Sequence, residues 1–301
     1  MPPLPSGSIL PGQLVSTDWL AERLGTPGLR IVDIRGYVTT TDLGGGRQRA
    51  EYTAARGEFD AAHIPGAVFV DWTIDIVDPD GDVKAQIAPP DRFAAAMSAR
   101  GVGDETDAVI VDHTGGHFAT RLWWALRYHG HDRAAVLDGG FNKWAAERRP
   151  LTSESAPSAP VVFTPAIRRD IRVEAADVVD AIGGGSDLII DARDALQYTG
   201  AVVRGPRGGH IPTAVNIPSK SLVNPDGTWK PWAEVGAILA AGGVEPDQRV
   251  VAYCNGGVTA TAVLFALAQT GHDNFANYDG SWNEWGERPD LPVESDDSPR
   301  P

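Results

Sequence analysis

The sequence predicts an α/β protein made of two similar domains, each with a parallel sheet that helices flank on both faces. Two observations support this prediction. Short apolar runs typical of buried strands alternate along the chain with helical patterns, and such alternation favours a parallel sheet. The chain also repeats its own motifs. Its 301 residues suffice for two domains of ordinary size.

The elements of the first half can be placed one by one. Strand-like runs are expected at Leu29–Asp33 and at residues 68–70, 108–112 and 134–137. Helical patterns are found at residues 17–24, 92–99 and 119–128. Thr17 and Asp91 are the expected N-caps of the first two helices. Gly101 and Gly130 are expected to end the second and third helices.

Three motifs occur twice in the chain. Residues 31–35 return as residues 189–193, residues 62–67 as 209–214, and residues 138–144 as 279–285. From His113 to Trp144 the second copy follows the first at one constant offset. We therefore expect two domains, residues 1–150 and 170–301. A Pro/Ser-rich linker at residues 151–169 is expected to join them.

The repeats also suggest roles for individual side chains. Asp33 and Arg35 recur as Asp191 and Arg193, which suggests an internal ion pair in each half. His210 precedes an Ile-Pro turn, as its counterpart does in the first half. A structural role and a catalytic role are both open for His210.

Charge and composition exclude several classes of protein. With 26 Lys+Arg against 40 Asp+Glu the formal net charge is -14, which disfavours binding to nucleic acid or to an anionic membrane. The longest apolar stretch is far shorter than the roughly 20 residues of a membrane-spanning helix. The N-terminal residues lack the basic and apolar regions of a signal peptide, so a cytoplasmic protein is expected.

Cys254 is the only cysteine of the chain. It can form no internal disulfide, and it lacks a partner for dithiol redox chemistry. His113 and His117 have a metal-compatible spacing without an obvious third ligand, so no metal and no cofactor are expected. The triple glycine at residues 44–46 lacks the Lys-Ser/Thr of a phosphate loop and is expected to be a flexible insertion.

Cys254 stands between an apolar, strand-like run and a segment that can begin a helix. Gly256 and Gly257 permit backbone angles that other residues avoid, so successive N–H groups can curl toward one centre. The free N–H groups at the start of the helix would point the same way. Such a loop favours a thiolate, a persulfide or another anion, and it predicts that Cys254 is a nucleophile.

These motifs resemble the tandem rhodanese-like sulfurtransferases of the thiosulfate and 3-mercaptopyruvate types. The family's active loop, Cys-X-X-Gly-Val-Thr, reads Cys254-Asn255-Gly256-Gly257-Val258-Thr259 here. Its upstream His-Ile-Pro-Gly reads His210-Ile-Pro-Thr213, and its downstream motif begins Asp279-Gly-Ser281-Trp282. The resemblance implies two rhodanese-like domains, of which the second is catalytic. The first is expected to be non-catalytic, because His113 occupies the cysteine position.

The resemblance further implies a two-step sulfur transfer. Cys254 would take the outer sulfur of a small anionic donor, thiosulfate or 3-mercaptopyruvate, as a persulfide. Cyanide or a thiol, for example that of a dithiol protein such as thioredoxin, would then accept this sulfur. The persulfide would be bound by the Ser281 hydroxyl and by the loop residues Asn255, Gly256, Gly257, Val258 and Thr259, chiefly through N–H groups. The expected supporting residues are Asp191, Arg193, His210 and Trp282.

Several positions depart from the family pattern. The loop residues after the cysteine are neutral, Gln197 replaces a substrate-binding arginine, and Gln86 replaces a first-domain histidine. Arg204 and Arg207, on a glycine-rich segment, are the candidates for binding the donor anion instead. A persulfide relay or binding protein without efficient turnover of small donors is an alternative. A cysteine phosphatase is less favoured, because Ala260 stands where its phosphate-binding arginine would be.

Overall fold

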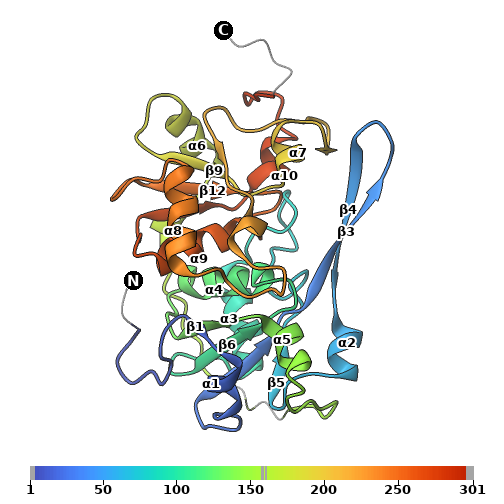
Figure 1. Cartoon of the computed structure of the whole chain (residues 1–301), viewed down its shortest axis with the longest axis vertical. Helices are drawn as coiled ribbons and strands as arrows, with labels where there is room; N and C mark the ends of the chain where they lie inside the picture. The colour runs from blue at the N-terminus through green and yellow to red at the C-terminus, as the bar shows by residue number, and fades with distance from the viewer. Residues whose placement is uncertain (1–3, 157–158, 160, 296–301) are drawn as a thin grey trace.

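The computed structural model describes residues 4–156, 159 and 161–295. Residues 157, 158 and 160 of the expected linker therefore lie outside the described part of the chain. Figure 1 shows two halves stacked one above the other, the first in blue to green and the second in yellow to red. Each half contains a five-stranded parallel sheet, with the order β1-β7-β6-β2-β5 in the first and β11-β9-β12-β13-β8 in the second.

The two sheets have the same topology once each strand is matched with its repeat. The first consists of β1 (Leu14–Val15), β2 (Leu29–Asp33), β5 (Ala67–Phe69), β6 (Asp107–Val111) and β7 (Ala134–Leu137). The second consists of β8 (Arg172–Val173), β9 (Leu188–Asp191), β11 (Val215–Asn216), β12 (Val250–Tyr253) and β13 (Phe275–Tyr278). The four strands expected in the first half are thus confirmed, and their ends differ by one residue at most.

Helices cover both faces of each sheet, as expected. The outer faces pack against α1 (Thr17–Ala21), α2 (Arg56–Ala61) and α5 (Gly140–Ala146) in the first half, and against α6 (Ala175–Ile182) and α10 (Ser281–Trp285) in the second. The inner faces pack against α3 (Pro90–Ala99), α4 (His117–Tyr128), α8 (Trp232–Ala241) and α9 (Ala260–Gln269). Successive strand residues serve opposite faces. In β6, for example, Val109 faces the outer core and Ile110 the inner one.

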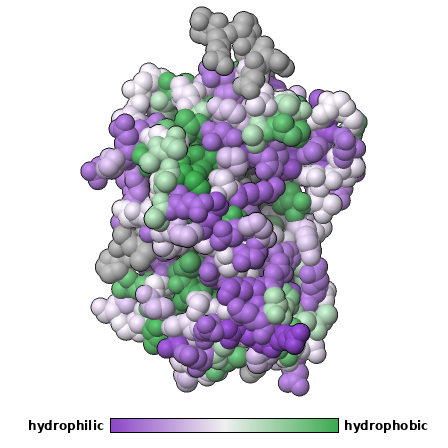
Figure 2. Space-filling view, in the orientation of Figure 1, coloured by the Kyte–Doolittle hydropathy of each residue, from purple (hydrophilic) through white to green (hydrophobic). Residues whose placement is uncertain are grey.

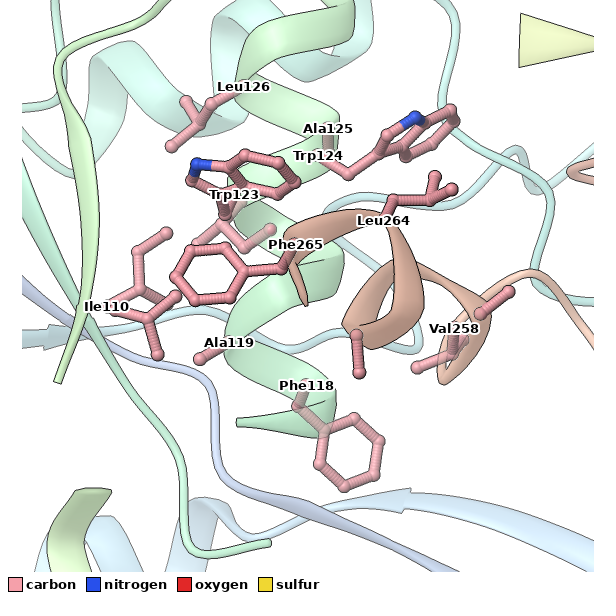
Figure 3. Close-up of a cluster of buried hydrophobic side chains, with 14 of the residues drawn as sticks. Ile110, Phe118, Ala119, Trp123, Trp124, Ala125, Leu126, Val258, Leu264 and Phe265 are labelled. Atoms are coloured by element: carbon pink, nitrogen blue, oxygen red, sulfur yellow. The ribbon is translucent and has the colours of Figure 1, made fainter. Parts of the chain in front are cut away.

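The inner faces of the two halves share one core, and α4 and α9 lie at its centre. Every residue of α4 is buried, because this helix is covered by its own sheet on one side and by the other half on the other. Trp123 of α4 meets Phe265 of α9 edge to face, with the ring centroids 5.0 Å apart (Figure 3). The hydroxyl groups of Thr120 and Thr261, which are repeats of each other, lie 3.0 Å apart.

The helix ends agree with the sequence only in part. Ser16, and not Thr17, is the N-cap of α1, since its side chain accepts the Trp19 N–H. The N-cap of α3 is Pro89, and Asp91 lies in the first turn instead. Gly101 and Gly130 follow α3 and α4 with φ of 72° and 90°, left-handed angles that end a helix at little cost. These two expected stops are confirmed.

The residues around the triple glycine form a long β-hairpin. Strands β3 (Gly36–Asp42) and β4 (Arg47–Ala54) pair antiparallel, and residues 44–46 make the turn. Figure 1 shows the hairpin rising from the first half along the side of the second. There β4 pairs in parallel with β10 (Val203–Arg204). The expected flexible insertion is therefore a strand pair that bridges the two halves.

Among the described residues, no helix combines the length and the apolar character needed to cross a bilayer. Figure 2 shows polar residues over much of one face of the molecule, with apolar residues in separate patches. Large exposed apolar side chains come from distant segments, for example Leu43, Val162 and Leu196. Single exposures of this kind are ordinary in globular proteins.

Candidate active site

Cys254 lies where β12 ends, six residues before the first residue of α9, Ala260. β12 is the middle strand of its sheet, and ligands of open parallel sheets bind beyond the carboxyl ends of such strands. Cys254 is 2% exposed, and Val258 of the same loop packs into the core that the halves share (Figure 3). The expected strand-to-helix position of the thiol is confirmed.

The start of α10 fixes the backbone of the Cys254 loop. The N–H of Trp282 donates to the Cys254 carbonyl at 3.1 Å, and that of Asn283 donates to the Asn255 carbonyl at 2.7 Å. These N–H groups belong to the first turn of α10, where a helix has no partners of its own for them. The downstream repeat motif therefore contributes backbone donors that hold the loop carbonyls in place.

Ser281 has a different role from the expected one. The Cys254 N–H donates to the Ser281 Oγ at 3.1 Å, and the Ser281 hydroxyl donates to the Tyr278 carbonyl at 2.7 Å. A hydroxyl group has one proton to donate, and the Ser281 hydroxyl donates it to the Tyr278 carbonyl. Ser281 thus holds the loop through the Cys254 N–H, and it has no donor left for a persulfide.

Gly257 makes the tight turn of the loop. Its φ is 68°, and a Cβ at this position would lie 2.8 Å from the Asp279 carbonyl oxygen, so both the angle and the space require glycine. The Gly257 carbonyl accepts hydrogen bonds from Asn277 Nδ2 at 3.1 Å and from Arg121 Nη1 at 3.0 Å. Arg121 belongs to α4 and also pairs with Asp279 at 2.7 Å. A side chain of the first half therefore stabilises the turn at Gly257.

The first half contains the same kind of loop, but with an acidic side chain inside it. Asp112 immediately precedes His113, and its carboxylate accepts four backbone N–H groups. The donors are Thr114 at 3.2 Å, Gly116 at 3.0 Å, Phe118 at 2.9 Å and Ala119 at 3.1 Å. This arrangement shows that the loop and the start of its helix bind an anion.

The second loop has the corresponding donors without an internal anion. Tyr253 stands at the position of Asp112, and its hydroxyl donates to Asp191 Oδ2 at 2.7 Å, away from the loop. Within the described residues, the backbone N–H groups of residues 255–260 have no protein acceptor. The Cys254 loop is therefore open to an anion from outside. Comparing position 112 with position 253 in the sequence could have revealed this difference.

A cavity of about 510 Å³ lies in front of both loops. Its second-half wall includes Cys254 and Asn255, and its first-half wall includes His113 and His117. Tyr52 of the bridging hairpin also lines it, and burial raises the pKa of this phenol. Since cavities of this size take small organic ligands, both halves contribute to one candidate binding site.

Arg204 lines this cavity together with Cys254. Its Nε donates to Gln48 Oε1 at 3.4 Å, so the hairpin of the first half orients a side chain of the second. Burial lowers the pKa of the guanidinium, against the attraction of Tyr52 and Asp194, but an arginine keeps its charge at neutral pH. Arg204 thus contributes a positive charge to the wall of the cavity that Cys254 also lines.

Arg207 does not reach the cavity, contrary to expectation. Its guanidinium donates to backbone carbonyls of the segment that follows α10. They belong to Trp285, Gly286, Arg288 and Leu291. Because its guanidinium N–H groups donate to these carbonyls, Arg207 holds the segment after α10 in place and is not available to bind a substrate.

The expected ion pairs occur in both halves. Arg193 binds Asp191 at 2.6 Å and lies over the Trp282 ring at 4.2 Å from its centroid. Arg35 binds Asp33 at 2.9 Å in the same manner. Because the ion pair recurs in the half without a thiol, we infer that its main role is to stabilise the fold. Arg193 also lines the cavity.

The histidines of the Ile-Pro turns have a structural environment. His210 Nδ1 lies 2.8 Å from the Tyr198 carbonyl, and the two rings stack at 3.8 Å. His63 repeats this arrangement with the carbonyl and ring of Phe59. Neither histidine lines the cavity. Of the two roles left open for His210, the geometry supports the structural one.

The two departures from the family pattern lie in different places. Gln197, in α7 (Ala195–Tyr198), lines the cavity and accepts a hydrogen bond from Asn255 Nδ2 at 2.9 Å. Gln86 is not among the residues that line it, and its carbonyl accepts the Asp78 N–H.

In the described part of the chain, no three His, Cys, Asp or Glu side chains gather as metal ligands would.

Fold and site together define a duplicated α/β protein with a single thiol in an anion-binding loop. Comparison with known families gives this class its name: the family described as "Rhodanese-like domain" matches residues 16–147 and again residues 174–288. The chain belongs to this family, with two tandem copies of the domain.

Relatives resemble the chain over nearly its full length. The 3-mercaptopyruvate sulfurtransferase of Escherichia coli K12 is 36% identical over 93% of this chain and 97% of its own. The sulfur carrier protein TtuD of Thermus thermophilus is 33% identical over 94% of this chain and 96% of its own. The crystal structure of SseA from Escherichia coli, described as having the rhodanese fold, superimposes with a TM-score of 0.78 at 33% identity, covering 90% of this chain and 98% of that one.

Proposed function

We propose that this protein is a sulfurtransferase in which Cys254 carries the transferred sulfur as a persulfide. One observation carries the proposal: two loops of the same design face one cavity, and only the loop with the thiol is free of an internal anion. In this proposal the second domain, residues 170–301, supplies the chemistry. The first, residues 1–150, closes the cavity and supports the loop.

The reaction proceeds in two displacements. The Cys254 thiolate attacks the outer sulfur of a small anionic donor, and sulfite or pyruvate leaves with the bonding electrons. The persulfide then lies among the N–H groups of residues 255–259, which have no acceptor among the described residues and stabilise its negative charge. A nucleophile, cyanide or a thiol, attacks the outer sulfur and returns Cys254 to the thiolate.

The donor is an anion, thiosulfate or 3-mercaptopyruvate, and Arg204 is its proposed ligand. Arg204 is the arginine of the glycine-rich segment that lines the cavity, and a guanidinium matches the oxygens of a sulfonate or a carboxylate. The Escherichia coli relative is named for 3-mercaptopyruvate, which supports this donor. Replacing Arg204 by alanine is expected to raise the donor KM about tenfold or more, the usual effect of losing a charged hydrogen bond.

A sulfur carrier is the second candidate, because a relative of 33% identity is named as one. A carrier would receive its sulfur from another protein and would turn over small donors slowly. Both candidates need the Cys254 persulfide, so they differ in the rate of donor turnover and not in the intermediate.

Steady-state rates for both donors, each with cyanide and with dithiothreitol, test the proposal. Turnover that depends on the donor and is abolished in Cys254→Ser supports the enzyme. Loading of Cys254 in a single slow event, without turnover, supports the carrier. Cleavage of p-nitrophenyl phosphate that is lost in Cys254→Ser would instead identify a phosphatase and overturn both.

A further inference from the structure

One tyrosine of the bridging hairpin borders the cavity with its ring held in place by the first half. Tyr52, on β4, lines the cavity together with Cys254 and Arg204. Its ring packs against that of Trp72 with the centroids 5.3 Å apart, and Trp72 is 1% exposed. The Nε1–H of Trp72 donates to the Thr53 carbonyl at 3.1 Å. Ring packing and this hydrogen bond therefore fix the position of Tyr52 at the wall of the cavity.

Tyr52 lies on the face of β4 that meets Arg204. Alternate residues of a strand point to opposite sides, and in β4 one side is exposed while the other is half-buried. The half-buried side consists of Gln48, Ala50, Tyr52 and Ala54. Gln48 accepts a hydrogen bond from Arg204 at 3.4 Å. Tyr52 is thus the second polar side chain that this face of the hairpin turns toward the arginine.

The hydroxyl of Tyr52 keeps its proton at neutral pH. Burial raises the pKa of this phenol above its usual value of 10.0. The Asn283 side chain lowers the pKa, as a donor to the phenol oxygen does, while a negative charge on Cys254 raises it and the Arg204 guanidinium lowers it. The phenol therefore lies within electrostatic reach of both Cys254 and Arg204. A hydroxyl group that accepts one hydrogen bond still has its own proton to donate.

Tyr37, on the partner strand β3, shows what a committed hydroxyl looks like on the same hairpin. Its hydroxyl donates to Glu58 Oε1 at 2.6 Å, so its proton is taken within the first half. Within the described residues, no carboxylate and no backbone carbonyl accepts the proton of Tyr52 in this way. Of the two hairpin tyrosines, Tyr52 is therefore the one whose hydroxyl can serve a ligand.

We propose that the Tyr52 hydroxyl is a second ligand of the anionic end of the sulfur donor, beside Arg204. The inference rests on the sulfur transfer proposed above, and it adds a residue of the first half to the donor site. The Arg204 guanidinium can bond two oxygens of a sulfonate or a carboxylate. These oxygens have further lone pairs, and a neutral phenol donates to one of them without adding a charge to the site.

This arrangement distributes the donor site over both halves. Arg204 belongs to β10 of the second half, and it stands opposite Gln48 where β10 pairs with β4. Tyr52 follows on the same strand of the first half. Arginine and tyrosine both have long side chains, so their polar ends can meet at one anion although their backbones lie apart. The outer sulfur of the bound donor then reaches Cys254 within the same cavity.

The rate of sulfur loading at a series of donor concentrations tests the inference. The full-length protein is mixed with thiosulfate or with 3-mercaptopyruvate and stopped after set times, and intact mass gives the fraction that carries one added sulfur. Tyr52→Phe keeps the ring and removes the hydroxyl. We expect its half-saturating donor concentration to rise about tenfold, the effect of losing a hydrogen bond to a charged group, and its maximal loading rate to stay within about twofold of the wild-type rate.

Tyr37→Phe is the matched control, because it removes a hydroxyl that is bonded to Glu58 and also keeps its ring. It should leave the half-saturating donor concentration unchanged. Discharge of the preloaded protein by dithiothreitol is the second control. It should be equally fast in Tyr52→Phe and in the wild-type protein, since the donor anion has left before this step, whereas a structural role of the hydroxyl would slow both steps.

An unchanged half-saturating concentration in Tyr52→Phe would overturn the inference. So would an equal rise in Tyr37→Phe, or a discharge that slows as much as loading does. Failure of the wild-type protein to load with sulfur would refute the proposed function itself. The two failures are distinct, because the inference is judged only from the difference between proteins that load.

Discussion

Asp112 and Tyr253 stand at equivalent positions before the two loops, and this single difference changes what each loop can hold. The Asp112 carboxylate fills the first loop with four hydrogen bonds. Tyr253 turns its hydroxyl to Asp191 instead and leaves the second loop open. In the proposed function the first half is not catalytic, and the absence of a thiol at His113 is then only one of two reasons.

A transplanted thiol tests this difference. In a Cys254→Ser background, His113→Cys should react with iodoacetamide no faster than an ordinary cysteine, because the Asp112 carboxylate repels a thiolate and occupies the N–H donors. Adding Asp112→Asn removes the charge and should raise the alkylation rate at pH 7 about tenfold. Equal rates for the single and the double replacement would contradict this account of the first loop.

Gly257 provides a second test, with Gly271 as its matched control. Both have left-handed φ angles, but only a Cβ at Gly257 meets another atom closely, the Asp279 carbonyl oxygen at 2.8 Å. Alanine at either position should lower the free energy of unfolding by about 1 to 2 kcal/mol. Persulfide formation should slow in Gly257→Ala only. If Gly271→Ala slows it equally, global stability and not loop geometry is responsible.

At the level of single residues, the sequence predicted the thiol, the loop and the repeated ion pairs, because motif spacing carries that information. It was wrong about Ser281 and Arg207. The Ser281 hydroxyl donates to a carbonyl three residues earlier, that of Tyr278, whereas the donors of Arg207 are taken by carbonyls of a segment that only the folded chain brings close. Asp112 was not predicted, because it lies one residue before the repeated loop and its counterpart, Tyr253, is a different kind of side chain.

The hairpin of β3 and β4 is the element that sequence patterns did not reveal. Most of β3 is exposed, and β4 alternates only between exposed and half-buried positions, so neither strand has the apolar alternation that marks a half-buried strand. Its partner, β10, belongs to the other half and is only two residues long. The hairpin itself is a local pairing of β3 with β4. Its attachment to β10 joins the two halves, and this attachment is a long-range property.

The hairpin should matter for donor binding, because it brings Gln48 to Arg204. A Cβ at Gly46 would lie 2.4 Å from the Ala201 carbonyl oxygen, whereas one at Gly45 meets nothing within 4 Å, and both residues have left-handed φ angles. Gly46→Val should therefore disturb the pairing with β10 and raise the donor KM several-fold, with little change in kcat. Gly45→Val should not. An unchanged KM in Gly46→Val would show that the hairpin does not orient Arg204.

The shared core explains how the molecule works as one unit. Arg121 of α4 reaches the Gly257 carbonyl, and the Ile87 N–H of the first half donates to Asp279 of the second at 2.8 Å. In the reverse direction, the Trp229 N–H donates to Asp138 at 2.9 Å. Each half thus binds the repeat motif of the other. The duplicated fold was predictable from the repeats, but these reciprocal contacts were not.

Buried histidines of the first half make the stability of the whole molecule depend on pH. Burial lowers the pKa of His129 to about 4, and its ring stacks on the buried ring of Phe93, with the ring centroids 3.9 Å apart. Between about pH 6.5 and pH 4 the unfolded chain binds the proton that the folded chain excludes, so the free energy of unfolding falls as the pH decreases. The pKa values of His117 and His131 are lowered as well, mainly by burial, and they act in the same direction.

Chemical denaturation at a series of pH values measures this effect. His129 alone should contribute up to about 3 kcal/mol across the window. His129→Phe, which cannot be protonated, should show a shallower decrease than the wild-type protein. The same slope in both proteins would mean that His129 does not control the acid sensitivity.

The sulfur on Cys254 is the centre of the account, and intact mass spectrometry measures it most directly. The protein is incubated with thiosulfate or with 3-mercaptopyruvate, desalted and weighed before and after addition of cyanide. We predict a mass increase of one sulfur atom with at least one donor, its loss with cyanide, and no increase in Cys254→Ser. An unchanged mass with both donors, or an equal increase in Cys254→Ser, would contradict the account.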